Sequence, residues 1–115
     1  MKLGDLLMAK PVLDELMRQR LNGRLAYQMA KNTRLIDNEL LAVEAGRRAI
    51  FERFSADGRT IPDDKLAEAN GEFDELIQQE VDLDLYTLTP EDLAVFTLTP
   101  AQVDLIMFLV DEAGE

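Results

Sequence analysis

The sequence has no histidine, cysteine or tryptophan. Without these residues the chain cannot use imidazole acid–base chemistry, a thiol nucleophile, a disulfide or a Cys/His zinc site. Glycine and proline are also scarce, at six and four of 115 residues, which argues against a disordered or fibrous chain. The glycines stand singly, so neither a P-loop nor a dinucleotide-binding loop is present. We therefore expect a folded, non-enzymatic chain with no cofactor and no metal site.

Long apolar runs are missing as well. The longest uncharged apolar stretch covers residues 105–110, whereas a membrane-spanning helix needs about 20 such residues. Near the N-terminus, charged residues interrupt the apolar positions before a secretory signal length is reached. These features predict a cytoplasmic protein that does not associate with membranes.

What the chain does have is an uneven distribution of charge. Its net charge is −11. Residues 1–56 contain ten Lys/Arg and seven Asp/Glu, whereas residues 57–115 contain two and sixteen. This asymmetry indicates either attraction between the two halves or an acidic surface that meets a partner, and solvated acidic helix faces are the simpler alternative. Direct binding of nucleic acid is not expected.

Helical periodicity dominates the first half. Apolar residues at three- and four-residue spacing predict a helix over about residues 3–20 and a second from Arg24 to Ala56. Asn22-Gly23 between them indicates a turn that ends the first helix, so the two form a helical hairpin. Pro11 favours a short turn before it and a firm helix after it. Asp57-Gly58 then closes the second helix with a left-handed cap.

The second half predicts a third helix, a β-ribbon and a C-terminal helix. The third helix follows Pro62 and runs to about Gln79. Residues 81–86 then alternate apolar and polar, which is typical of a strand, and residues 94–98 are the nearest pairing partner. The pentapeptide aromatic-Thr-Leu-Thr-Pro occurs at 86–90 and again at 96–100.

Each copy of the pentapeptide predicts a helix that is capped by threonine and begins with proline. The first helix is brief, ending at Ala94, and the second continues to about Glu112. The fold class is therefore mostly α, as a single domain over residues 1–115. It consists of a long helical hairpin, a third helix, a short β-ribbon and a C-terminal helix.

The length of the second helix predicts association. Thirty-three helical residues span about 50 Å, whereas a compact globule of this chain length is roughly 35 Å across. The helix must bend near Asn32-Thr33 or Gly46, or its free end must pack on another chain. A homo-oligomer or a complex with a protein partner is therefore expected.

Two groups of residues are candidates for partner binding. A basic cluster of Arg18, Arg20, Arg24, Lys31 and Arg34 surrounds the hairpin tip and is more suited to docking on the acidic half than to binding phosphates. Apolar residues near the end of the second helix and in residues 105–110 exceed one helical stripe, so they either fill the core or contact another subunit. The partner-binding candidates are Arg24, Lys31, Arg34, Ile50, Phe51, Phe54, Leu105, Phe108 and Leu109.

Residues that suggest catalysis are few. Asp82 and Asp84 project from one face of the expected strand, as a carboxylate pair or a cation site requires. An EF-hand loop that begins at Asp82 would need glycine and glutamate where the chain has Thr87 and Leu93. A solvated strand face is the simpler interpretation. Ser55, the only serine, has neither a histidine nor a local lysine to activate it.

Several short segments in order resemble a known group of proteins. They are Leu13-x-x-Leu16, residues 26–32 (AYQMAKN), residues 49–54 (AIFERF), residues 72–76 (EFDEL) and residues 80–83 (EVDL). In this order they resemble a family of small uncharacterised bacteriophage proteins, over nearly the whole chain. The resemblance implies a phage origin and a virion-related or accessory role, in the host cytoplasm or the assembled virion, and it supplies no catalytic residues. Pro11 and the repeated Thr-Leu-Thr-Pro have no counterpart in it.

Three functional hypotheses follow. The leading one is a non-enzymatic interaction or assembly module, a phage structural or accessory subunit. The alternative is an acidic inhibitor that imitates nucleic acid and occupies the groove of a host DNA- or RNA-binding protein, since duplex DNA presents a negative charge about every 1.7 Å. The third is a hydrolase that depends on Asp82 and Asp84.

Overall fold

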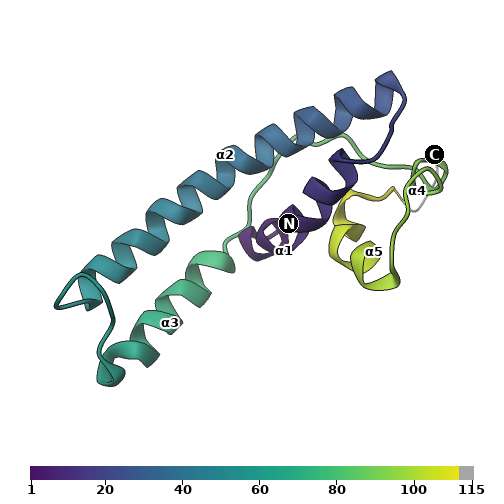
Figure 1. The fold of residues 1–115 in the computed structure, drawn as a ribbon. Coiled ribbons are helices and arrows are strands. Elements are labelled where there is room, and N and C mark those ends of the chain that lie inside the picture. The colour runs from purple at the N-terminus through teal and green to yellow at the C-terminus, as the bar shows by residue number, and fades with distance from the viewer. Residues whose placement is uncertain (112–115) are drawn as a thin grey trace.

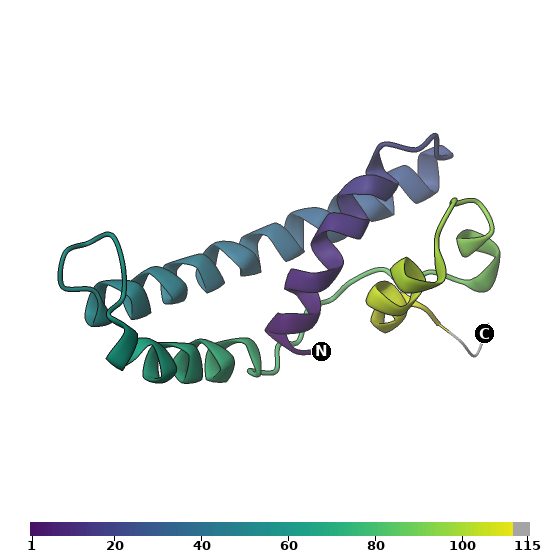
Figure 2. The same ribbon diagram turned by 60° about the horizontal axis from the view of Figure 1, so that its bottom comes forward.

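The computed structural model describes residues 1–111, and it is mostly helical, as the sequence predicts (Figure 1). The molecule is elongated, with extents of 51 × 25 × 24 Å. The longest helix, α2, runs along the whole length, and α1 and α3 lie against its two halves (Figures 1 and 2). The elements are α1 (Leu3–Met17), α2 (Gly23–Phe54), α3 (Asp63–Ile77), α4 (Pro90–Leu93), α5 (Pro100–Ile106) and a 3₁₀ turn, η1 (Met107–Leu109).

Helix α1 continues through Pro11, so the predicted turn before this proline is wrong. The helix starts at Leu3, where the carboxylate of Asp5 accepts a hydrogen bond of 2.9 Å from the backbone N–H of Lys2. A proline inside a helix costs about 3 kcal/mol. Buried apolar side chains lie on both sides of Pro11, and each contributes about 1.5–3 kcal/mol, which outweighs that cost. They are Leu3, Leu6, Ala9, Val12, Leu13 and Leu16.

The core lies where α1, the first half of α2 and the C-terminal elements meet. Leu13 and Ile36 are fully buried there, and Ile106 and Leu109 close the core from the C-terminal side. Lys10 joins α1 to α2 at the edge of this core through an ion pair of 3.2 Å with Asp37 and a second one with Asp14. Burial lowers the pKa of Lys10, but hydrogen bonds to the two carboxylates outweigh that effect and raise it.

The turn between α1 and α2 uses Asn22-Gly23 differently from the prediction. Asn22 caps the start of α2, because its Oδ1 accepts a hydrogen bond of 2.8 Å from the N–H of Leu25. Gly23 is already the first residue of α2 and does not adopt a positive φ. Gly58, with φ of 75°, does adopt the left-handed conformation, but in the loop after α2, which ends earlier, at Phe54.

Helix α2 is a single continuous element of 32 residues. The second half of α2, which the sequence leaves overhanging, is covered on one side by α3 of the same chain. Gly46 makes this packing possible, because a Cβ atom there would lie only 3.0 Å from a methyl carbon of Leu76. The glycine that weakens α2 as an isolated helix therefore allows close contact between α2 and α3.

The predicted β-ribbon between residues 81–86 and residues 94–98 does not form. Residues 80–88, which we call the strap, cross the molecule in an extended conformation, and the described chain contains only two isolated β-bridges, one at each end of it. Glu80 pairs with Lys2, and Leu88 pairs with Val110. Residues 94–98 instead follow α4 as a turn and an irregular segment.

Asn32 takes the place of a partner strand at Tyr86, near the C-terminal end of the strap. This side chain on α2 is fully buried. Its Nδ2 donates to the carbonyl of Tyr86 and its Oδ1 accepts from the N–H of Tyr86, both at 2.8 Å. The amide therefore replaces the two hydrogen bonds that a neighbouring strand would make. The apolar positions of the strap, Val81, Leu83 and Leu85, pack against the core.

The repeated Thr-Leu-Thr-Pro motif caps two helices, which confirms the prediction. Thr89 accepts a hydrogen bond from the N–H of Asp92 at the start of α4, and Thr99 does the same for Gln102 in α5. In each helix the side chain of the same residue, Asp92 or Gln102, accepts a hydrogen bond from the threonine N–H, which completes a capping box. Helix α5 gives way to η1 at Met107, and Val110 pairs with Leu88 instead of continuing the helix, so the C-terminal helix ends earlier than predicted. Glu112, its predicted end, lies outside the described residues.

Candidate functional site: a cleft between α2 and α3

An open cleft of about 220 Å³ lies between the second half of α2 and α3. Ile50 and Phe51 of α2 form one wall, and Ala69 and Phe73 of α3 form the other. Ile61, from the loop between the helices, also lines it. Ala69 is buried, whereas the Ile and Phe side chains are half-buried and remain in contact with solvent. The cleft therefore presents two aromatic rings on rigid helices.

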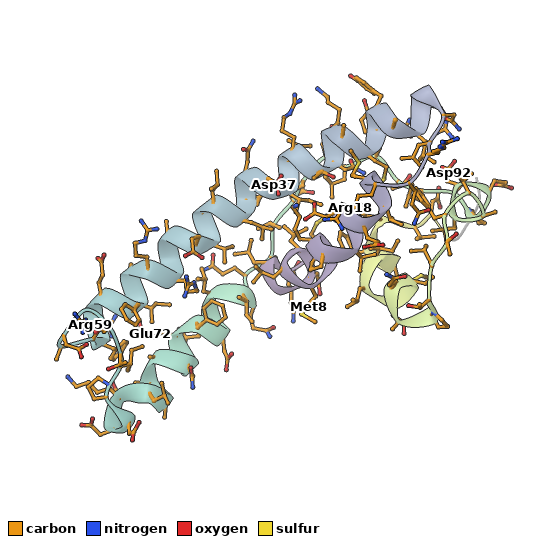
Figure 3. All side chains as sticks on the ribbon, viewed as in Figure 1. Met8, Arg18, Asp37, Arg59, Glu72 and Asp92 are labelled. Carbon is orange, nitrogen blue, oxygen red and sulfur yellow. The ribbon has the colours of Figure 1, made fainter. Side chains whose placement is uncertain are left out.

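Contacts at two points fix the distance between the cleft walls. Toward the middle of the molecule, Leu76 packs on the bare backbone of Gly46. Near the end of α2, Nη1 of Arg53 lies 2.8 Å from Oε1 of Glu72 on α3 (Figure 3). The Arg53 guanidinium also lies over the ring of Phe54, which is buried beside the cleft. Because both walls are helical and anchored, the cleft is pre-formed.

The rim of the cleft is polar. Arg47 and Asn70 line its edge, and Arg47 and Arg48 also line an adjoining hollow together with Phe51 and Glu44. Nε of Arg47 donates to Glu44 at 3.0 Å. This hydrogen bond lowers the pKa of the Glu44 carboxyl and raises the pKa of Arg47. Arg48 lines the adjoining hollow but not the cleft itself, and it has no ion pair among the described residues.

The volume of the cleft decides which class of ligand fits. Sites for drug-sized molecules are about 300–1,000 Å³, and this cleft is smaller. An apolar cavity of about 150 Å³ is enough to hold a benzene ring. The cleft is therefore suited to one large apolar side chain, as in the anchor pockets of protein interfaces.

The nine predicted partner-binding residues do not meet at one site. Ile50 and Phe51 line the cleft, and Phe54 is buried next to it. At the other end of the protein, Leu109 is in the core, and Leu105 and Phe108 pack against the core while half-buried. The three basic residues lie along the first half of α2, where they are exposed: Arg24, Lys31 and Arg34.

The basic cluster docks on the acidic half at one residue. Nη2 of Arg24 lies 2.7 Å from Oδ1 of Asp92 on α4, and Asp92 is buried (Figure 3). Lys31 instead lies over the ring of Tyr27, 5.9 Å from its centre. Burial raises the pKa of Asp92, but hydrogen bonds from Thr89 and Arg24 together with the Arg24 charge outweigh it, so the pKa is lowered.

The lowered pKa of Asp92 predicts acid sensitivity. A group whose pKa is lower in the folded state stabilises the fold above its unfolded pKa, here about 4, and loses that effect as the pH falls through the folded pKa. We expect Asp92→Asn to reduce the free energy of unfolding at pH 7 by about 1–2 kcal/mol, and to reduce it less at pH 3. Urea unfolding at both pH values measures this, and an equal loss at both would contradict it.

Asp82 and Asp84 lie on the strap with exposed side chains, on the face away from Val81, Leu83 and Leu85. This is the alternation that the sequence predicts. Over residues 1–111, no group of three or more acidic side chains is placed to hold a metal ion. The two aspartates therefore form no cation site with a third carboxylate of the described chain.

The sequence did not predict the residues of α3 that form one wall of the cleft. Ala69 and Phe73 were visible only as part of the apolar periodicity of α3, and Ile61 as a residue before a proline. The signal that could have found them is the pairing of α3 with α2, because a glycine in a helix, here Gly46, allows a side chain such as Leu76 to approach closely. Asn32 was missed too, although it occupies an apolar position between Met29 and Ile36.

Comparisons with family models, with curated proteins and with solved structures find no match to this chain. Separately, none of the helices among residues 1–111 combines the length and the apolar character needed to cross a membrane.

Proposed function

We propose that this protein is a non-enzymatic interaction module that binds a protein partner through the cleft between α2 and α3. The observation that supports this most is the pre-formed apolar cleft, with Phe51 and Phe73 half-exposed on anchored helices. Interfaces gain most of their binding energy from a few large side chains inserted into such pockets. The cleft costs little to organise, because Gly46 and the Arg53–Glu72 ion pair already hold its walls.

The chemistry of the cleft defines the partner. Its interior accepts one phenylalanine-, tryptophan- or leucine-sized side chain, and Arg47 at the rim together with Arg48 in the adjoining hollow favours a neighbouring carboxylate. The proposed ligand is therefore a protein segment that presents a large apolar residue flanked by aspartate or glutamate. In this proposal α1 and α2 form the helical hairpin expected from the sequence, which supports the cleft.

Filling the cleft from its rim tests this proposal. Asn70 is exposed and lines the cleft, so Asn70→Trp is expected to place an indole over the opening without removing any buried side chain. A random-peptide library selected on the wild-type protein should enrich sequences with one large apolar residue next to an acidic residue. Asn70→Trp should weaken the selected peptides at least tenfold, about 1.4 kcal/mol.

Ala67→Trp is the matched control, because Ala67 is exposed on α3 and does not line the cleft. This variant should bind the selected peptides like the wild type. If no sequence class is enriched, or if Asn70→Trp binds as tightly as the control, the cleft is not the binding site. Circular dichroism of both variants establishes that α3 is intact.

The imitation of nucleic acid is a second candidate, favoured by one observation. Exposed carboxylates follow one another along α3 and the strap: Asp63, Asp64, Glu68, Asp74, Glu75, Glu80, Asp82 and Asp84. A mimic predicts binding to a basic host protein that competes with DNA and collapses when salt is raised. Binding through the apolar cleft should instead persist at 1 M salt, so the salt dependence of one captured complex separates the two.

The biological setting is also a proposal. From the resemblance of its short segments to small phage proteins, we propose that the protein is a structural or accessory subunit, in the host cytoplasm or the assembled virion. If so, the protein should copurify with particles and remain on them through a high-salt wash. Its absence from purified particles would argue for a free accessory protein.

A further inference from the structure

The side of α2 that faces away from α1 and α3 carries a regular pattern of exposed residues. They are spaced alternately four and three residues apart, like the seam positions of a coiled coil, but they are mostly polar, so charge rather than apolar character must select their partner. We call these residues the outward stripe: Tyr27, Lys31, Arg34, Asn38, Leu41, Ala45, Arg48 and Glu52. Every one of them is exposed, and Leu41, at 71 %, is the most exposed of the large hydrophobic residues among 1–111. The strap lies beside the first part of the stripe, where Tyr27 contacts Tyr86 edge-on and Lys31 lines a hollow together with Asp84 and Tyr86. Figure 1 shows no helix along this side of α2.

From this pattern we infer that two copies of the protein pair through the outward stripe, with their α2 helices antiparallel. In an antiparallel pair, each a position of one helix faces a d position of the other. One register of the two α2 helices brings complementary residues together at every such layer. In it, Leu41 of each copy packs on Ala45 of the other, Asn38 meets Arg48, and Arg34 meets Glu52. The twofold axis repeats each contact, so the pair has two of each.

The residues beside the stripe support the same register. Leu35, Ala42 and Ala49 flank it on one side, and all three are exposed. In the antiparallel pair Leu35 lies opposite Ala49 of the second copy, and Ala42 lies opposite Ala42. Six alanines at the contact, three from each copy, allow close approach of the two helices, so the two leucines of each copy become buried. On the other side of the stripe, Glu44 of one copy lies opposite Glu44 of the other. In each copy the ion pair between Arg47 and Glu44 compensates part of this repulsion.

Charge excludes the neighbouring arrangements. A parallel pair in register would place Arg34 against Arg34 and Arg48 against Arg48. Sliding the antiparallel pair by seven residues in one direction places Lys31 against Arg48, and sliding it in the other places Leu41 against Glu52. Like charges in contact and a leucine against a carboxylate are both unfavourable. Self-complementary charge therefore selects a second copy of this chain as the partner.

The contact is short, and this sets the expected strength. Residues 34–52 of α2 span about 28 Å, so the interface belongs to the small, transient class. We expect a monomer–dimer equilibrium that sedimentation equilibrium detects between roughly 10 and 500 µM protein. The inference names a second copy as partner for the proposed assembly role. The stripe shares Arg48 with the hollow beside the cleft but includes no residue that lines the cleft itself. Asn70→Trp should leave dimerisation unchanged.

A charge exchange within one chain is the decisive test. Arg34 and Glu52 are about 27 Å apart along α2, too far to interact within one molecule. Arg34→Glu alone creates two Glu–Glu contacts and Glu52→Arg alone creates two Arg–Arg contacts, so each should weaken the dimer about tenfold. The double variant restores two opposite-charge contacts only in the antiparallel pair, and it should dimerise within about twofold of the wild type.

Two further variants test whether Leu41 lies in the contact between the two copies. Leu41→Glu should abolish the dimer, whereas Met8→Glu, at an equally exposed position on α1 (61 %), should leave it intact. Circular dichroism should be unchanged, since all these side chains are exposed. A monomer at every concentration, or a double variant no better than the single variants, would overturn the inference. So would a dimer that survives Leu41→Glu.

Discussion

Replacing Asn32 with leucine is expected to lower the free energy of unfolding by about 2–3 kcal/mol, although leucine has the same branched arrangement of heavy atoms and is more hydrophobic. The loss arises because the N–H and the carbonyl of Tyr86 would lose both hydrogen bonds of 2.8 Å in a site where Asn32 is fully buried. Urea unfolding measures the loss. Hydrogen exchange should also quicken at Tyr86 more than in α1, because the strap would be released locally.

Asn32→Asp provides a control whose effect on stability should depend on pH. Aspartate keeps the acceptor for the Tyr86 N–H but, when ionised, directs a second oxygen at the Tyr86 carbonyl. The pKa of this buried carboxyl should therefore be higher in the folded state than in the unfolded state. Relative to the wild type, the variant should be least destabilised below about pH 4 and lose stability as the pH rises. A destabilisation independent of pH would contradict the geometry at Asn32.

Leu13→Ala is the second change with a large expected effect, a loss of about 3 kcal/mol. Leu13 is fully buried on the face of α1 that meets α2 and α5. Truncation removes apolar contact and leaves a cavity that rigid helices on two sides cannot close. Differential scanning calorimetry should show a fall in Tm of roughly 10–15 °C.

Met8→Ala on the same helix is the matched control for Leu13→Ala. Met8 is 61 % exposed (Figure 3), so its truncation should change the free energy of unfolding by less than about 0.5 kcal/mol. Equal effects of the two substitutions would show that α1 does not bury the face that includes Leu13. The comparison therefore tests the packing of α1 independently of the strap.

The sequence predicted those parts of the fold that depend on local rules. The three long helices were found because apolar residues recur at helical spacing, and α4 and α5 because Thr89 and Thr99 each precede a proline. These signals lie within a few residues of each other. The mostly α class follows from them directly.

The parts that were missed depend on contacts between distant segments. Alternation in residues 81–86 correctly indicated an extended chain with one buried face, but alternation does not reveal what binds the backbone. Here a side chain 54 residues away does so, at Asn32. Pro11 was misjudged because the burial on both sides of it depends on packing against α2. The same reasoning applies to the cleft, where Ile50 and Phe51 were selected and the α3 wall was not.

The measurement that tests the proposed function most directly uses the five isoleucines of the chain as probes. With their methyl groups labelled for NMR, the full-length protein is titrated with the peptide selected on it. The account predicts that the methyl signals of Ile50 and Ile61, which line the cleft, move with added peptide. Those of Ile36 and Ile106, in the core at the other end of the molecule, should stay in place. Shifts confined to the core isoleucines or to Ile77, or no shifts at all, would contradict binding in the cleft.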